Sequence, residues 1–147
     1  MSIQQSDVLY TAVATAENGR DGRVTTDDGK IDVVLNPPKE MGGSGAGTNP
    51  EQLFAVGFAS CFESALSAVS RRQKVDADDA VIDSKVSLLP NESRGFDLAV
   101  ELDVTLPSID DADAAIEAVR AAHKVCPYSN ATRGNIDVKL TANGQPV

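Results

Sequence analysis

The sequence predicts an α+β fold, in which blocks of strands and helices follow one another without regular alternation. Apolar and polar residues alternate through the N-terminal third, which is typical of half-buried strands. A long apolar stretch, 53–69, follows a helix start signal. Two further alternating segments come next, at 80–89 and 96–106. This order favours antiparallel sheets with helices over a doubly wound parallel sheet.

The N-terminal strands form a predicted β-meander. Alternation begins near Val8 and Tyr10 and resumes at 23–26 and 31–35, with a turn at 27–29. The next segment contains Pro37, Pro38 and the glycines of Gly42–Gly47. It is too rich in Gly and Pro for regular structure, and we predict a mobile loop or lid.

A long helix should begin near residue 50. Thr48 or Asn49 can serve as N-cap, with Pro50 in the first turn and Glu51 placed for a capping box. The stretch 53–69 is apolar or small nearly all the way round, which predicts a central, buried helix. It is short for a membrane span and carries charge, so we do not interpret it as one.

The second half should supply a hairpin, a helix and a last strand. Segments 80–89 and 96–106 are joined through 90–95. Ser108 or Asp110 can cap a second helix that ends near Lys124. Cys126-Pro127 then opens a short turn or helix, and 135–142 is the last strand.

Composition narrows the function classes. The 147 residues suit one compact domain, 1–147, with 41% hydrophobic residues and no Trp. The net charge of −9 repels a nucleic-acid backbone. The N-terminus does not resemble a signal peptide, so we expect a cytoplasmic protein without membrane attachment. Cytosolic cysteines stay reduced, which argues against a permanent disulfide but permits a transient, working one.

The two cysteines are the first candidates for chemistry. Cys61 falls within the long helix, where a cysteine can pack as a small hydrophobe or, with a cation nearby, react as a thiolate. Cys126 lies too far along the chain for a C-x-x-C motif. Pro127 fits the first position of a helix, whose amides would lower the pKa of that thiol. An unremarkable cysteine in a turn is the alternative.

Other site types find little support. Two cysteines and the single His123 cannot form a four-ligand zinc site without carboxylates, and none is suitably spaced, so we expect no metal. His123 ends the second predicted helix. It is better interpreted as a surface residue favoured by the helix dipole than as a general base.

Two long motifs resemble the organic hydroperoxide resistance proteins, which share a superfamily with the osmotically inducible protein C group. The first is GTNPEQLF at 47–54, running on to ASCF at 59–62, and the second is VCPYSNATRGN at 125–135. The similarity spans essentially the whole chain. NGRDG at 18–22 also matches the family's arginine loop, although Asn18 stands where glycine is usual.

The resemblance implies an intertwined homodimer of OsmC-like fold, with strands around two central helices and active sites at the subunit interface. It implies that Cys61 is the peroxidatic thiolate and Cys126 the resolving thiol, with Arg20 and Glu51 as the polar pair that activates Cys61. No cofactor is expected to stay bound. The implied reductant is dihydrolipoamide or a lipoylated protein.

The implied activity is a peroxidase that reduces organic hydroperoxides in the response to oxidative stress. A thiolate attacks the peroxide, and the sulfenic acid condenses with a second thiol to a disulfide. Phe54, Phe58 and Phe62 recur every four residues, which more often indicates core than a substrate wall. Apolar side chains beside the thiol would favour alkyl and fatty-acid hydroperoxides over hydrogen peroxide.

The spacing between Glu51 and Cys61 bears on how the Cys61 thiol is activated. Glu51 and Cys61 are ten positions apart, or roughly 15 Å along a straight helix. Either Arg20 and Glu51 come at least partly from the other subunit, or the helix breaks near Gly57. The Arg20 loop and the Gly42–Gly47 loop are expected to move, with Arg20 swung away once Cys61 is oxidised.

Two alternatives remain. The osmotically inducible branch has overlapping chemistry, although the CPYS motif at 126–129 favours the hydroperoxide resistance proteins. A thiol redox sensor or small-ligand carrier would oxidise without catalytic cycling. No helix-turn-helix or basic patch supports a sensor that acts on DNA.

Overall fold

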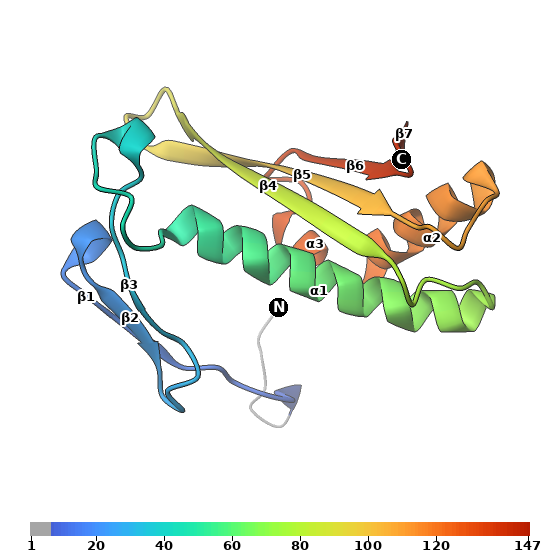
Figure 1. Cartoon of the computed structure of the whole chain (residues 1–147), viewed down its shortest axis with the longest axis horizontal. Coiled ribbons are helices and arrows are strands. Elements are labelled where there is room, and N and C mark those ends of the chain that lie inside the picture. Colours follow the sequence, from blue (N-terminus) through green and yellow to red (C-terminus); the bar gives the residue numbers. More distant parts are fainter. Residues whose placement is uncertain (1–6) are drawn as a thin grey trace. The chain divides into compact units, whose positions relative to one another are not determined.

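The computed structural model describes residues 7–147 and has the predicted α+β composition (Figure 1). The chain separates into two compact units, Met1–Pro50 and Glu51–Val147, which are described in turn. The assignment of 1–147 to one domain stays a prediction.

The first unit holds the predicted meander. Its three strands are β1 (Ala14–Glu17), β2 (Arg23–Thr26) and β3 (Asp32–Val34), paired antiparallel in the order β1-β2-β3. The first strand begins at Ala14, so the prediction of a strand from Val8 is wrong for residues 8–13. Ala14 pairs with Thr26, the last residue of β2, and the chain turns at once. The Asp27 amide still donates to the Val13 carbonyl at 3.1 Å, and the described pairing ends there.

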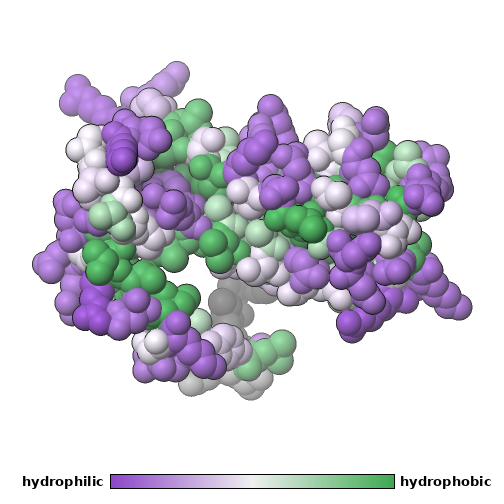
Figure 2. Space-filling model, viewed as in Figure 1, coloured by the Kyte–Doolittle hydropathy of each residue, from purple (hydrophilic) through white to green (hydrophobic). Residues whose placement is uncertain are grey.

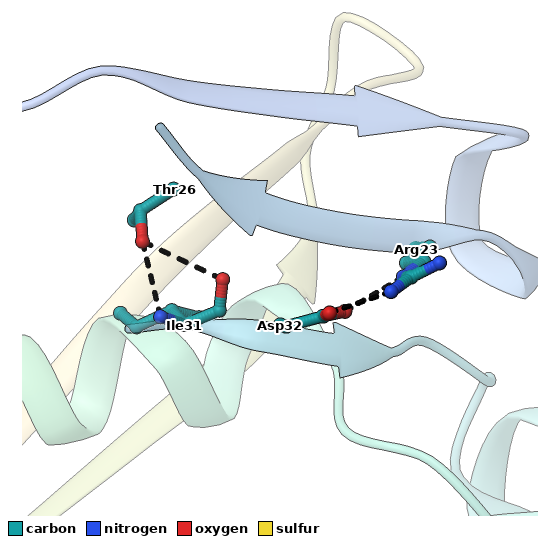
Figure 3. Close-up of polar contacts among 4 residues, drawn as sticks. All are labelled: Arg23, Thr26, Ile31 and Asp32. Carbon is teal, nitrogen blue, oxygen red and sulfur yellow. Dashed lines mark hydrogen bonds and ion pairs between the residues drawn. The ribbon is translucent and has the colours of Figure 1, made fainter. Parts of the chain in front are cut away.

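Side chains fix the β2–β3 hairpin (Figure 3). The Arg23 guanidinium donates through Nε and Nη2 to the two carboxylate oxygens of Asp32, at 2.6 and 2.5 Å. At the other end, the Ile31 amide donates to the Thr26 hydroxyl at 3.0 Å. The forked contact of Arg23 with both oxygens of Asp32 is specific for arginine. This contact holds the start of β2, which directly follows the short 3-10 helix Gly19–Asp21 that carries Arg20.

The glycine-rich segment has more structure than predicted. A 3-10 helix spans Lys39–Met41, and the Gly43 and Gly45 amides donate to the carbonyls of Pro38 and Pro37. A Cβ at Gly43 would lie 2.0 Å from the Pro37 carbonyl oxygen. Glycine therefore allows the loop to fold back on itself. Whether it moves as a lid stays a prediction.

The second unit combines a long helix, α1 (Pro50–Gln73), with a four-stranded sheet and two further helices. The sheet order is β4-β5-β6-β7, formed by Val81–Pro90, Phe96–Thr105, Val138–Ala142 and Gln145–Pro146. It is antiparallel except between β5 and β6. A parallel neighbour requires a crossover, which α2 (Ala112–Val125) and α3 (Pro127–Thr132) provide.

The second helix is capped by Asp111, where we had predicted Ser108 or Asp110. The Asp111 carboxylate accepts from the Asp113 amide at 3.3 Å. Ser108 lies three residues before this cap, and its hydroxyl donates to Asp79 at 2.7 Å. The helix ends at Val125, close to the predicted end.

One hydrophobic core joins α1, the sheet and α2. Buried members come from all three elements. Helix α1 contributes Phe58, Phe62 and Leu66, strand β5 contributes Val100, Leu102 and Val104, and helix α2 contributes Ala115, Ala118, Val119 and Ala122. Small alanines on α2 allow the helix to approach the sheet closely.

α1 is buried on one face only, so the prediction of a wholly buried helix is wrong in part. Ser60, Glu63 and Ser64 are exposed, and Val56 keeps 65% of its surface exposed. A single sheet face can cover only one stripe of a helix. Apolar residues are interspersed with hydrophilic ones on the face in Figure 2. By length and composition alone, α1 is long and apolar enough to cross a membrane. The core helix of a soluble protein can meet the same two criteria.

Candidate active site

The fold brings the two cysteines together. The Sγ atoms of Cys61 and Cys126 lie 3.6 Å apart although 65 positions separate them in the chain. Cys61 is partly exposed on α1, whereas Cys126 is completely buried, and both are free thiols. A disulfide has an S–S length of about 2.05 Å. An approach of roughly 1.5 Å would therefore join them.

Cys126 is the single residue between two helices. It is both the C-cap of α2 and the N-cap of α3, with φ −63° and ψ 122°. Its amide donates to the Ala122 carbonyl and its carbonyl accepts from the Asn130 amide. Pro127 takes the first position of α3, which confirms that Cys126-Pro127 opens a short helix.

The surroundings of Cys61 in the second unit act on its pKa in opposite directions. Burial is the largest effect and raises the pKa above the ordinary value of a thiol. The Tyr128 backbone amide, on α3, lowers the pKa by donating a hydrogen bond to the sulfur. The hydrogen bond with Cys126, and the charge of that thiol when ionised, raise it again. The net effect is a raised pKa.

An aromatic cluster packs beside the two thiols. The ring centroids of Phe54 and Phe58 lie 6.1 Å apart. The ring centroid of Tyr128 lies 6.1 Å from that of Phe54 and 5.7 Å from that of Phe58. Gly57 makes room for Tyr128, since a Cβ there would come within 2.7 Å of its hydroxyl oxygen. Phe58 and Phe62 are fully buried in the core, and Phe54 is partly exposed. A substrate-binding role for the three phenylalanines stays a prediction.

The predicted activating pair is divided between the two units. Arg20 lies in the 3-10 helix Gly19–Asp21 of the first unit, and Glu51 lies in the first turn of α1. Helix α1 runs unbroken through Gly57. The alternative of a helix break near Gly57 is therefore wrong. The roles of Arg20 and Glu51 stay predictions.

His123 is packed rather than freely exposed, which corrects its assignment to the surface. Its Nδ1 lies 2.9 Å from the hydroxyl oxygen of buried Ser129. Burial lowers the pKa of His123, and the charge of Arg133 lowers it further. The imidazole is therefore predominantly neutral at pH 7, so the helix dipole does not explain its position. Among residues 7–147, no group of three or more His, Cys, Asp or Glu could hold a metal ion.

Comparison with known proteins identifies the family. The sequence pattern of the OsmC-like proteins matches residues 42–141, a span that contains both thiols. The chain belongs to the OsmC-like family. Within the OsmC-like proteins it is 51% identical, over 91% of the chain and 94% of the relative, to an organic hydroperoxide resistance protein of Xanthomonas axonopodis pv. citri. Another such protein, OhrB of Bacillus subtilis, is 47% identical over 90% of the chain and 96% of its own length.

Solved OsmC-like structures agree with the fold. A putative organic hydroperoxide resistance protein of Vibrio cholerae, with captopril in one of its active sites, superposes with a TM-score of 0.91 at 46% identity. The match covers 98% of this chain and 99% of that one. The resemblance to organic hydroperoxide resistance proteins and the OsmC-like α+β fold are thus confirmed.

Tyr128, Ser129 and Arg133 had no predicted role, and Gly57 had been considered only as a place where α1 could break. Tyr128 and Gly57 touch across α3 and α1, and Ser129 and Arg133 both contact His123. Tyr128, Ser129 and Arg133 belong to the second motif, so the motif contained a signal. Their contacts depend on the angle between helices, which no local pattern encodes.

Proposed function

We propose that this protein is a thiol peroxidase that reduces alkyl and fatty-acid hydroperoxides to alcohols and so contributes to organic peroxide resistance. The observation that carries the proposal is the 3.6 Å separation between a partly exposed and a buried thiol. Support also comes from relatives named organic hydroperoxide resistance proteins at about half identity.

The proposed cycle begins at Cys61, because it is the more exposed thiol of the pair. Its thiolate attacks one peroxide oxygen, the O–O bond breaks, and the alkoxide takes a proton to leave as an alcohol. Cys61 becomes a sulfenic acid. The Cys126 sulfur then attacks the Cys61 sulfur, water leaves, and a Cys61–Cys126 disulfide forms.

A cation must lower the pKa of Cys61 for this chemistry at neutral pH, because burial and Cys126 raise it. We assign that role to Arg20, with Glu51 holding the guanidinium in position. Arg20 would also stabilise the developing alkoxide. Exchange of Arg20 for Gln should then raise the pKa of Cys61 and slow peroxide reduction, while Lys should retain part of both effects. Equal behaviour of the Gln and Lys variants would contradict the assignment.

The subunits of a homodimer are proposed to share the site. Val56, which lies on the exposed face of α1 beside polar residues and keeps 65% of its surface exposed, is an apolar side chain that a second copy would cover. Because α1 is continuous, Glu51 and Cys61 are about 15 Å apart along it. Each heterodimer of Cys61→Ser and Glu51→Ala chains should therefore regain one working site of two, or about half of the wild-type rate per dimer. A randomly paired equal mixture, in which about half of the dimers are heterodimers, should regain about a quarter. No recovery in verified heterodimers would exclude sharing.

The proposed reductant is a dihydrolipoyl group, free or on a lipoylated protein in the cytoplasm. Its two thiols can open the disulfide by exchange and close to a cyclic lipoyl disulfide. The apolar rings of Phe54 and Phe58 support bulky organic substrates over hydrogen peroxide. Oxidation is expected to release the Arg20 loop, and identical Arg20 positions in reduced and oxidised crystals would contradict this.

Turnover of cumene hydroperoxide with dihydrolipoamide as the only reductant tests the function. Wild type should cycle, Cys61→Ser should not react, and Cys126→Ser should react about once and stop. Glutathione in place of dihydrolipoamide controls for the reductant, and osmotically inducible relatives provide a substrate comparison. A wild-type protein that oxidises once without cycling would favour the redox sensor or ligand carrier.

A further inference from the structure

Two side-chain contacts cross the corner between α2 and α3, on either side of Cys126. The His123 Nδ1 lies 2.9 Å from the Ser129 hydroxyl, and the Arg133 guanidinium donates to the His123 carbonyl oxygen at 2.5 Å. His123 is in the last turn of α2, Ser129 is inside α3, and Arg133 is the C-cap of α3. These three residues form what we call the corner clamp.

Without the clamp, the corner would depend on the backbone groups of Cys126 and on the packing of Tyr128 against Phe54 and Phe58. Both helix-ending backbone hydrogen bonds at the corner use the amide or carbonyl of that residue. Its φ and ψ lie in the extended region that a residue before proline prefers, so the backbone there is unstrained, and contacts around the corner set the angle between the helices. α3 has only six residues, too few to hold its own direction in water.

Rotation at this corner would move the Cys126 sulfur, which must close a 3.6 Å gap to the Cys61 sulfur. Orientation of reacting groups has large effects, and a misplacement of about 1 Å can cost 10²-fold in rate. Ser129 is fully buried and its hydroxyl meets the half-buried His123, so that contact is partly shielded from water. Because the imidazole is predominantly neutral at pH 7, the contact involves no buried charge.

We propose that His123, Ser129 and Arg133 are positioning residues for the resolving step, and that they hold Cys126 where it captures the Cys61 sulfenic acid before a second hydroperoxide does. This inference rests on the proposed function. Capture forms the disulfide and releases water. In the competing reaction the sulfenic acid reduces a second hydroperoxide to an alcohol and becomes a sulfinic acid.

The Cys61 sulfenic acid thus becomes either a disulfide or a sulfinic acid. The ratio of these two products is not measured by peroxide consumption alone. The first oxidation of Cys61 does not use the clamp, so its rate should stay within about twofold of wild type in Ser129→Ala. Ring closure should slow about tenfold or more. The hydroperoxide concentration that converts half of Cys61 to sulfinic acid should fall by the same factor, since the two reactions compete.

Matched variants separate positioning from general weakening of α3. Thr132→Val removes another buried hydroxyl of α3, but that hydroxyl donates to Tyr128 and Ser129 carbonyls within the helix and does not cross the corner. His123→Asn keeps a polar group near the Nδ1 position and should restore most of the closure rate that His123→Ala loses. Arg133→Met should slow closure and spare the first step.

Rapid-quench mass spectrometry after one equivalent of cumene hydroperoxide would follow sulfenic acid and disulfide separately. The expected result is slow closure after one equivalent in Ser129→Ala and His123→Ala, with Thr132→Val and His123→Asn near wild type. In a separate titration with several equivalents, sulfinic acid should form at lower hydroperoxide concentration in the two slow variants. Equal slowing in Ser129→Ala and Thr132→Val, or unchanged closure in both Ser129→Ala and His123→Ala, would overturn the clamp.

A second oxidant keeps this test independent of peroxidase activity. Diamide adds to Cys61 and is displaced by Cys126, so it measures ring closure without a hydroperoxide. Slow closure with diamide in Ser129→Ala, but not in Thr132→Val, would support the clamp even if wild type failed to reduce cumene hydroperoxide. That failure would refute the proposed function alone, whereas unchanged diamide closure would refute the clamp.

Discussion

Tyr128 lies directly over Gly57, so close that a Cβ on the glycine would come within 2.7 Å of the tyrosine hydroxyl oxygen and 3.0 Å of its ring. Gly57 is on α1, one turn before Cys61, and Tyr128 is on α3, two residues after Cys126. Because Gly57 has no side chain, α1, which carries Cys61, and α3, which follows Cys126, can approach this closely.

A double-mutant cycle tests this contact. Gly57→Ala should destabilise the wild type by up to about 2 kcal/mol, because overpacking costs about 1–3 kcal/mol and better helix propensity returns at most about 1. In a Tyr128→Ala background the sign should reverse, since only the propensity gain remains. Chemical denaturation of the four proteins gives both values. Stabilisation of similar size in both backgrounds would show that Tyr128 does not need the space.

The pKa of Cys61 should fall when Cys126 is replaced by Ala. The Cys126 side chain raises that pKa through its hydrogen bond and its charge, while the Tyr128 amide that lowers it remains. The rate of alkylation of Cys61 by iodoacetamide, followed against pH, should have its midpoint at lower pH in the variant. A midpoint at or above that of the wild type would contradict the coupling.

His123 should titrate below the ordinary histidine range. Burial and the Arg133 charge lower its pKa, and it is the one histidine of the chain, so a single imidazole resonance reports it by proton NMR. Arg133→Met should raise this pKa. Values at or above about 6.5 in the wild type would be inconsistent with the buried contact.

The same shift gives a pH dependence of stability. As pH falls below about 6.5, the unfolded chain binds a proton at this residue before the folded chain does, so folding stability is lost down to the folded pKa. His123→Asn should lose less stability than wild type between pH 7 and 5. Carboxylates contribute equally to both proteins, and parallel curves would exclude His123 as a cause.

Asn143 ties the β6–β7 turn to the segment before α2. Its side chain accepts from the Leu106 amide at 2.7 Å and donates to the Leu106 and Ile109 carbonyls at 3.2 Å, with φ at +48°. Asn143→Ala should cost about 2–3 kcal/mol, because it unpairs buried backbone groups and strains φ. Asn143→Gly should cost less by about 1 kcal/mol, since glycine tolerates that φ. Equal losses would show that the backbone conformation contributes nothing.

The sequence predicted most elements because their signals are local. Alternation gave the two long strands, the Pro50 start gave α1, and Cys126-Pro127 gave α3. The boundaries that failed were decided by partners elsewhere in the chain. Residues 8–13 lie beyond the point where β2 ends and the chain turns, and the chain before α2 places Asp111 rather than Ser108 at the cap.

The sequence by itself determined the α+β class, the OsmC-like resemblance and the two thiols as candidates. Only the tertiary structure decided that these thiols lie 3.6 Å apart, that α1 is unbroken and buried on one face, and that His123 packs on Ser129. The parallel pairing of β5 with β6 was likewise decided there. Local patterns fix which face of an element is apolar, whereas distances between elements depend on how those faces pack, and here a missing Cβ at Gly57 and the contacts around Cys126 set them.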